Sequence, residues 1–80
     1  MSCEKAYTEY LDALHVKTRI AEELTPLMLS FVHTPGVPFE LPGDEMFERA
    51  GQLMKEERVA IERFLAAREA WFEAAKRHRY

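Results

Sequence analysis

The chain has 80 residues, of which 48% are hydrophobic and 31% are charged, and its formal net charge is −3. With 3 glycines, 4 prolines and 1 cysteine, the composition excludes a collagen-like repeat, a disordered tail and a disulfide-rich scaffold. The length fits one domain, and the mild negative charge argues against a dedicated nucleic-acid-binding domain, whose affinity comes mainly from cations on phosphates.

A first helix is predicted from about Cys3 to Val32, with Glu4 placed to interact with the positive end of the helix dipole. Pro26 lies inside this segment and removes one backbone donor, yet the apolar spacing continues beyond it. We therefore expect either a kink at Pro26 or a break into a short helix over residues 26–32. The predicted apolar stripe comprises Ala6, Tyr10, Ala13, Leu14, Ile20, Ala21, Leu24 and Met28.

Residues 33–43 contain three of the prolines and two of the glycines, which predicts a loop. A second, long helix is predicted from about Asp44 to His78, and at 1.5 Å per residue it is roughly 50 Å long. Two helices joined by one loop predict a single helical domain over residues 1–80. The expected fold is all-α, an antiparallel helical hairpin.

The second helix carries more apolar surface than a hairpin can cover. One predicted stripe contains Met46, Leu53, Ala60, Phe64 and Trp71. A second stripe, rotated by roughly 80°, contains Phe47, Met54, Ile61, Leu65 and Phe72. A domain this small also has a thin core. We therefore expect hairpins to associate into a helical bundle, and a homodimer is favoured because two-fold dimers are the commonest oligomers.

Three charged side chains fall inside the predicted apolar arcs, namely Lys17, Glu57 and Arg68. In an antiparallel hairpin with this loop, residues whose numbers add to about 75 lie level with each other. This relation sets Tyr10 opposite Phe64, and it sets Lys17 opposite Glu57. The sequence therefore predicts that the two opposite charges meet.

Two interpretations of this polar cluster stay open. One is a buried ion pair between Lys17 and Glu57 that fixes the helix register, with a hydroxyl from Tyr7 or Tyr10. The other is a pocket for a small anionic ligand such as a nucleotide. In that pocket Lys17 and Arg68 would supply cations and a tyrosine would supply a stacking surface.

The C-terminal segment combines aromatic and basic side chains: Trp71, Phe72, Lys76, Arg77, Arg79 and Tyr80. In one interpretation the cations complement the helix dipole and the aromatic rings are core or dimer contacts. In the other, these residues form an exposed patch that binds a partner protein, because Trp, Tyr and Arg are enriched at binding hot spots.

The sequence contains no recognisable catalytic, metal-binding or phosphate-binding motif. None of His15, His33 and His78 is paired at the spacing of a metal site, and no glycine-rich phosphate loop occurs. We therefore expect no enzyme, no catalytic residue, no metal and no cofactor. No apolar run approaches the ~20 residues of a membrane span, and a lone cysteine without an export signal predicts a cytoplasmic protein.

Together these patterns favour a small non-enzymatic interaction protein that binds a partner protein, as regulator, inhibitor or accessory factor. Phages and mobile elements often encode short chains of this kind. One alternative is an oligomer that binds a small anionic ligand or nucleotide through Lys17, Arg68 and a tyrosine. A second alternative is an assembly subunit of a larger complex.

Overall fold

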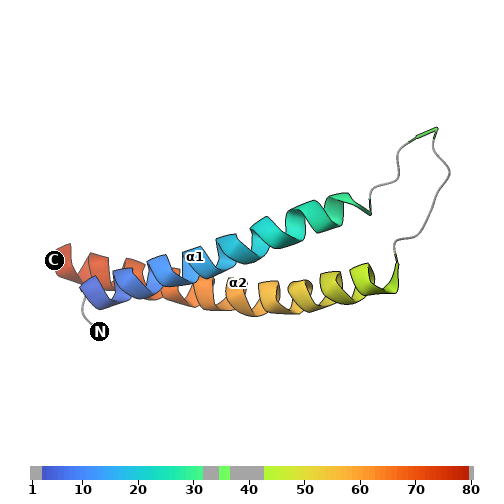
Figure 1. Ribbon diagram of the computed structural model, residues 1–80. Helices are drawn as coiled ribbons and strands as arrows, with labels where there is room; N and C mark the ends of the chain where they lie inside the picture. The colour runs from blue at the N-terminus through green and yellow to red at the C-terminus, as the bar shows by residue number, and fades with distance from the viewer. Residues whose placement is uncertain (1–2, 32–34, 37–42, 80) are drawn as a thin grey trace.

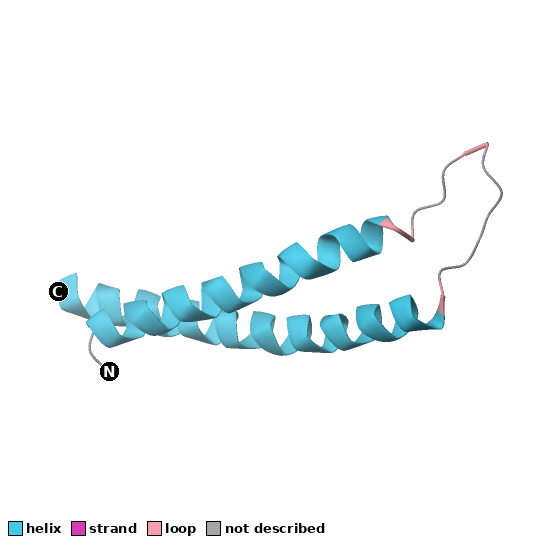
Figure 2. Cartoon of the chain, viewed as in Figure 1, coloured by secondary structure: helices cyan, strands magenta, loops and turns pink. Residues whose placement is uncertain are grey.

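The computed structural model consists of two long antiparallel helices, α1 (Cys3–Leu29) and α2 (Asp44–Arg79), which lie side by side (Figure 1). The structure describes residues 3–31, 35–36 and 43–79, apart from the side chain of Arg79. Within these residues it contains helices and turns and no strand (Figure 2). The predicted all-α helical hairpin is therefore confirmed.

Helix α1 continues unbroken through Pro26 and ends three residues later at Leu29. The predicted separate helix beginning at Pro26 is therefore wrong: Pro26 removes one backbone hydrogen bond, and the helix tolerates this loss and continues for three more residues. The backbone amide of Ser30 donates to the carbonyls of Pro26 (3.3 Å) and Leu27 (3.1 Å), which closes the last turn. A kink at Pro26 stays a prediction, and Val32 lies outside the described residues.

Helix α2 begins directly after Gly43. The carbonyl of Gly43 accepts hydrogen bonds from the amides of Met46 (3.1 Å) and Phe47 (3.3 Å), and so starts the helical ladder. Asp44 and Glu45 occupy the first turn, where carboxylates suit the positive end of the helix dipole. In the turn at residues 35–36, Gly36 has a φ of 89°, a conformation that side chains other than glycine rarely adopt.

The core between the two helices is thin. Among the described residues, those buried in this core are Ala6, Ala13, Leu24, Ala50, Leu53, Ala60 and Ala67. Five of these seven are alanines, whose small side chains let the helices approach closely but remove little apolar surface from water. Leu53 is the largest side chain that is completely enclosed, at 1% exposure. The stability of a single hairpin therefore depends strongly on a few side chains.

We expect Leu53→Ala to lower the free energy of unfolding by about 2–3 kcal/mol, because it leaves a cavity in a core with few other large side chains. The measurement is urea unfolding followed by circular dichroism at one fixed protein concentration. Val59→Ala is the matched control, because Val59 is 66% exposed on the same helix, and its effect should stay within about 0.5 kcal/mol. Equal losses for the two variants would contradict this description of the core.

Candidate functional site

One long side of the hairpin exposes large apolar side chains. On α2 these are Phe47, Met54, Leu65 and Phe72, which are 39–65% exposed. They are four of the five members of the second predicted stripe, and the fifth, Ile61, is half-buried. On α1, Tyr7 and Met28 are 45% and 38% exposed. We call these six exposed side chains of the two helices the apolar face.

The two helices contribute to the same side of the hairpin. On α2 the four side chains lie about 100–120° around the helix from Leu53, counted in the direction of rising residue number. Tyr7 and Met28 lie about 60–120° from Ala13 of α1 in the same sense. Because the helices run in opposite directions, this shared sense of rotation brings both sets to one side. The apolar face therefore spans both helices along most of their length.

The apolar face is hollowed near the loop end of the hairpin. A groove of about 540 Å³ lies there, lined by Leu24, Thr25, Met28, Leu29, Met54 and Glu57. The side chains that line it are mainly aliphatic, and Glu57 adds one carboxylate. The groove offers space for apolar side chains of another molecule.

The opposite side of the hairpin carries ion pairs between the helices. Arg63 donates hydrogen bonds to Glu9 (2.9 Å) and to Asp12. Arg49 donates to Glu23 (2.9 Å). We call these five side chains the ionic edge. All five remain substantially accessible to solvent, so their pairing fixes the register of the helices more than it stabilises them.

The ionic edge was not predicted from the sequence, although the numbering of the paired residues indicates it. In this hairpin the numbers of level residues add to about 75, which sets Asp12 opposite Arg63. The sequence predictions used this relation only for the charges within the apolar arcs, and its use on exposed charges would have found the pair. The hydrogen bond from Arg63 and its positive charge lower the pKa of Asp12 below the usual value of 3.8, and the same contacts raise the pKa of Arg63.

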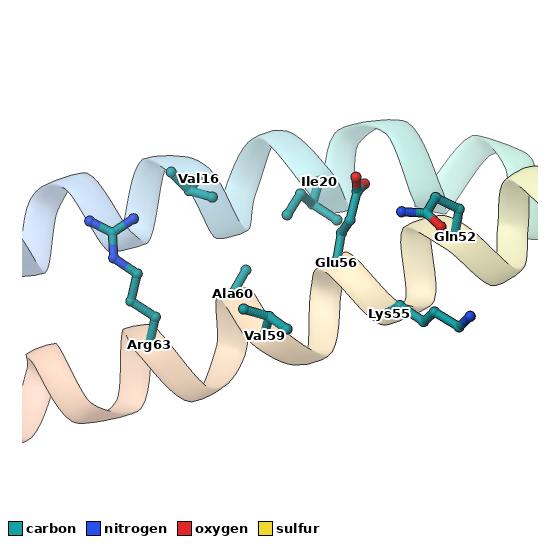
Figure 3. Close-up of a pocket in the computed structure, with 8 residues that line it drawn as sticks. All are labelled: Val16, Ile20, Gln52, Lys55, Glu56, Val59, Ala60 and Arg63. Atoms are coloured by element: carbon teal, nitrogen blue, oxygen red, sulfur yellow. The ribbon is translucent and has the colours of Figure 1, made fainter.

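A second groove, of about 410 Å³, lies on the side of the ionic edge (Figure 3). Val16 and Ile20 of α1 project toward Val59 and Ala60 of α2 and form its apolar floor (Figure 3). Charged and polar side chains line the rest of it: Gln52, Lys55, Glu56 and Arg63. The larger exposed apolar side chains of the two helices, Phe47, Met54, Leu65 and Phe72 among them, lie on the other side.

Four aromatic rings connect the start of α1 to the second half of α2. The ring of Trp71 stacks on Tyr10, with centroids 5.2 Å apart, and lies 5.6 Å from the ring of Tyr7. Tyr10 also contacts Phe64 at 5.6 Å, as the register relation predicts. This aromatic cluster holds the two helices together at the end away from the loop.

Lys17 and Arg68 both lie against one ring of this cluster. The ammonium of Lys17 is 5.2 Å from the centre of the Phe64 ring, and the guanidinium carbon of Arg68 is 5.6 Å from it. The structure thus brings together three residues predicted to form one site, Lys17, Arg68 and Tyr10, with Tyr7 joined to them through Trp71. Both contacts have the geometry of cation–π interactions.

The predicted buried ion pair between Lys17 and Glu57 is wrong. The ion pairs among the described residues do not include it, and no charged side chain there is buried. The backbones are level at these two positions, but the long side chains of Lys17 and Glu57 extend in opposite directions along the hairpin, each toward the N-terminus of its own helix. Lys17 accordingly reaches Phe64, whereas Glu57 lines the groove beside Leu24 and Met28.

The predicted C-terminal patch divides into parts with different surroundings. Trp71 is half-buried against α1, whereas Phe72 is 65% exposed and belongs to the apolar face. Lys76 and Arg77 are exposed. The side chain of Arg79 and all of Tyr80 lie outside the described residues. Binding of a partner protein by this patch stays a prediction.

No known family model, no curated protein and no solved structure matches this chain. Over residues 3–31, 35–36 and 43–79, the structure gathers no three His, Cys, Asp or Glu side chains that could hold a metal ion. Neither helix, as far as the structure describes it, is long and apolar enough to cross a membrane. Function is therefore inferred from the side-chain geometry alone.

The Asp12–Arg63 pair predicts an acid-sensitive contribution to stability. Because the folded pKa of Asp12 is lowered, the pair stabilises the hairpin above the unfolded value near 3.8, and this stabilisation is lost as the pH falls through the lower folded pKa. We expect Asp12→Asn to flatten the dependence of the melting temperature on pH between about pH 5 and pH 3.

Glu69→Gln is the matched control, since it removes an exposed α2 carboxylate that forms no ion pair in the described part of the chain. It should leave the pH dependence close to that of the unmodified chain. If both variants change the slope equally, the ionic edge has no specific role in acid stability.

Proposed function

We propose that the chain is a non-enzymatic interaction protein that acts by binding another helical protein surface through its apolar face. The observation that carries this proposal is the exposure of Phe47, Met54, Leu65 and Phe72 along one line of α2. Scattered apolar side chains are normal on protein surfaces, but a long continuous set marks an interaction site. Leu29 and Val59, which are also exposed, lie off this line.

The spacing of the apolar face suits a helical partner. Phe47, Met54 and Ile61 follow one another at intervals of seven residues, and so do Leu65 and Phe72. A seven-residue interval keeps side chains on one face of a helix and is the spacing used to pack against another helix. The groove beside Met28 and Met54 adds space for inserted side chains.

Energetics also support association. The core of the single hairpin consists mainly of alanines, while larger apolar side chains remain in water on the apolar face. Covering a side chain the size of leucine or phenylalanine contributes about 1.5–3 kcal/mol when burial is complete. Binding would therefore supply stabilisation that the interhelical core does not. In this proposal the chain regulates, inhibits or assembles with its partner by occupying the partner's surface.

A second candidate function is binding of a small anionic ligand. It is favoured by Lys17 and Arg68, which both lie beside Phe64 and Tyr10 and form no ion pair in the described part of the chain. Two cations next to aromatic rings suit a nucleotide, whose phosphates take the charges and whose base stacks.

Calorimetric titration with a nucleoside triphosphate tests the second candidate. If it holds, Lys17→Met weakens binding about tenfold or more while the helical circular dichroism signal is kept, since one charge-assisted contact is lost. Lys76→Met, which removes an exposed cation elsewhere on the helices, should not weaken binding. Absence of binding by the unmodified chain would eliminate this function.

The proposed function is tested by site-specific photo-crosslinking in cells. We expect a photoreactive amino acid at position 65 or 72 to give protein–protein adducts, because both positions lie on the apolar face. At position 59, where Val59 is at least as accessible as Leu65 and Phe72 but lies outside that face, adducts should be rare. Equal adduct formation at positions 59, 65 and 72 would contradict binding through the apolar face.

A further inference from the structure

We propose that a second copy of this chain covers the apolar face, with the two α2 helices antiparallel across a two-fold axis beside Ala60. This inference rests on the proposed function, and it names the partner and the arrangement. In the resulting four-helix bundle the loop ends of the two hairpins lie at opposite ends. Three observations carry the inference: the spacing of the exposed side chains, the charges beside them, and the size of the face.

The exposed apolar side chains of α2 are distributed symmetrically. Phe47 and Phe72 are equally far along the helix from the peptide bond between Val59 and Ala60, and so are Met54 and Leu65. A two-fold axis that is perpendicular to α2 and passes beside that point sets each Phe47 against Phe72 of the second copy. It also sets each Met54 against Leu65 of the second copy.

This symmetry is what a homodimer requires. A two-fold interface uses the same patch twice, so the patch must be complementary to itself after rotation. A different partner protein would place no such demand on the spacing within α2. In the proposed arrangement aromatic rings meet at both ends of the contact and aliphatic side chains meet inside it.

The charges on the outer flank of the stripe are centred on Ala60, half a residue from this axis. Arg58 and Glu62 lie equally far on either side of Ala60, both are exposed, and neither forms an ion pair in the described part of the chain. The two-fold axis sets Arg58 of each copy against Glu62 of the other. In the alternative arrangement, both hairpins have their loop ends at the same end of the bundle. Each α2 would then pack on α1 of the other copy, and Arg58 would not face Glu62.

The side of the hairpin that carries the apolar face is large enough for a stable dimer interface. Helix α2 has 36 residues and is about 54 Å long, and two helices side by side are about 20 Å wide. Their common side therefore has an area of roughly 1,000 Å², compared with about 800 Å² per partner in a standard protein–protein interface.

Distances between nitroxide spin labels on the two copies test the arrangement. The labels are attached to Glu45→Cys or to Glu69→Cys, each in a Cys3→Ser background so that only one cysteine is present. Both glutamates are exposed, and along α2 one precedes Ala60 and the other follows it. With the proposed axis we expect about 45 Å between labels at position 45 and about 30 Å between labels at position 69. The difference arises because position 45 is farther from the axis.

Two results would overturn the inference. If both hairpins have their loop ends at the same end of the bundle, labels at positions 45 and 69 give similar distances below about 25 Å. That result refutes the proposed antiparallel arrangement of the two α2 helices. Absence of any distance between copies, at concentrations up to the solubility limit, refutes the dimer. If crosslinks at positions 65 and 72 then lead to a different protein, the proposed function survives and only this inference fails.

Charge reversal provides a second, independent test in sedimentation equilibrium. Arg58→Glu and Glu62→Arg should each weaken self-association about tenfold, because each variant brings like charges together twice. An equal mixture of the two variants should associate as tightly as the unmodified chain. The matched control pair, Lys55→Glu and Glu56→Lys, changes the net charge equally on the side of the second groove. If the control variants weaken self-association as much as Arg58→Glu and Glu62→Arg do, contact between Arg58 and Glu62 is contradicted.

Discussion

The limited capacity of two helices to cover each other governs this molecule. A helix in a hairpin has one neighbour, so only one stripe of its surface is removed from water. In α2 that stripe contains Ala50, Leu53, Ala60 and Ala67, and it is mostly occupied by small side chains. The larger apolar side chains beside it remain in solvent because no third helix of the same chain is present among the described residues to cover them.

The polar and apolar contacts between the helices have different roles. On one side, Arg63 and Arg49 pair with carboxylates of α1 and set the register, but they remain exposed and add little free energy. On the other side, the apolar face offers free energy that is realised only when another molecule covers it. The aromatic cluster around Trp71 joins the helix ends between these two sides. The polar side of the hairpin therefore fixes the helix register, and the apolar side leaves large side chains exposed.

Much of the architecture could be predicted from residue patterns. The prolines and glycines after Phe31 predict that the two helices are separate, and α1 and α2 are, although most of the predicted loop lies outside the described residues. The doubled apolar stripe of α2 anticipates the exposed side chains of the apolar face. The pairing of Lys17 with Glu57 was wrong, because these two long side chains extend apart, Lys17 toward Phe64 and Glu57 into the groove beside Met28. Ala50 and Ala67 were not singled out, since alanine gives a weak hydrophobic signal although its small size suits close helix packing.

The dependence of the thermal unfolding midpoint on protein concentration tests the central claim most directly. If a single hairpin leaves its apolar face uncovered and a second copy covers it, unfolding is coupled to dissociation. The midpoint must then rise as the concentration is raised over a hundredfold range. A midpoint that stays constant over that range, with one cooperative transition, would show that the isolated hairpin is complete by itself and would contradict the account.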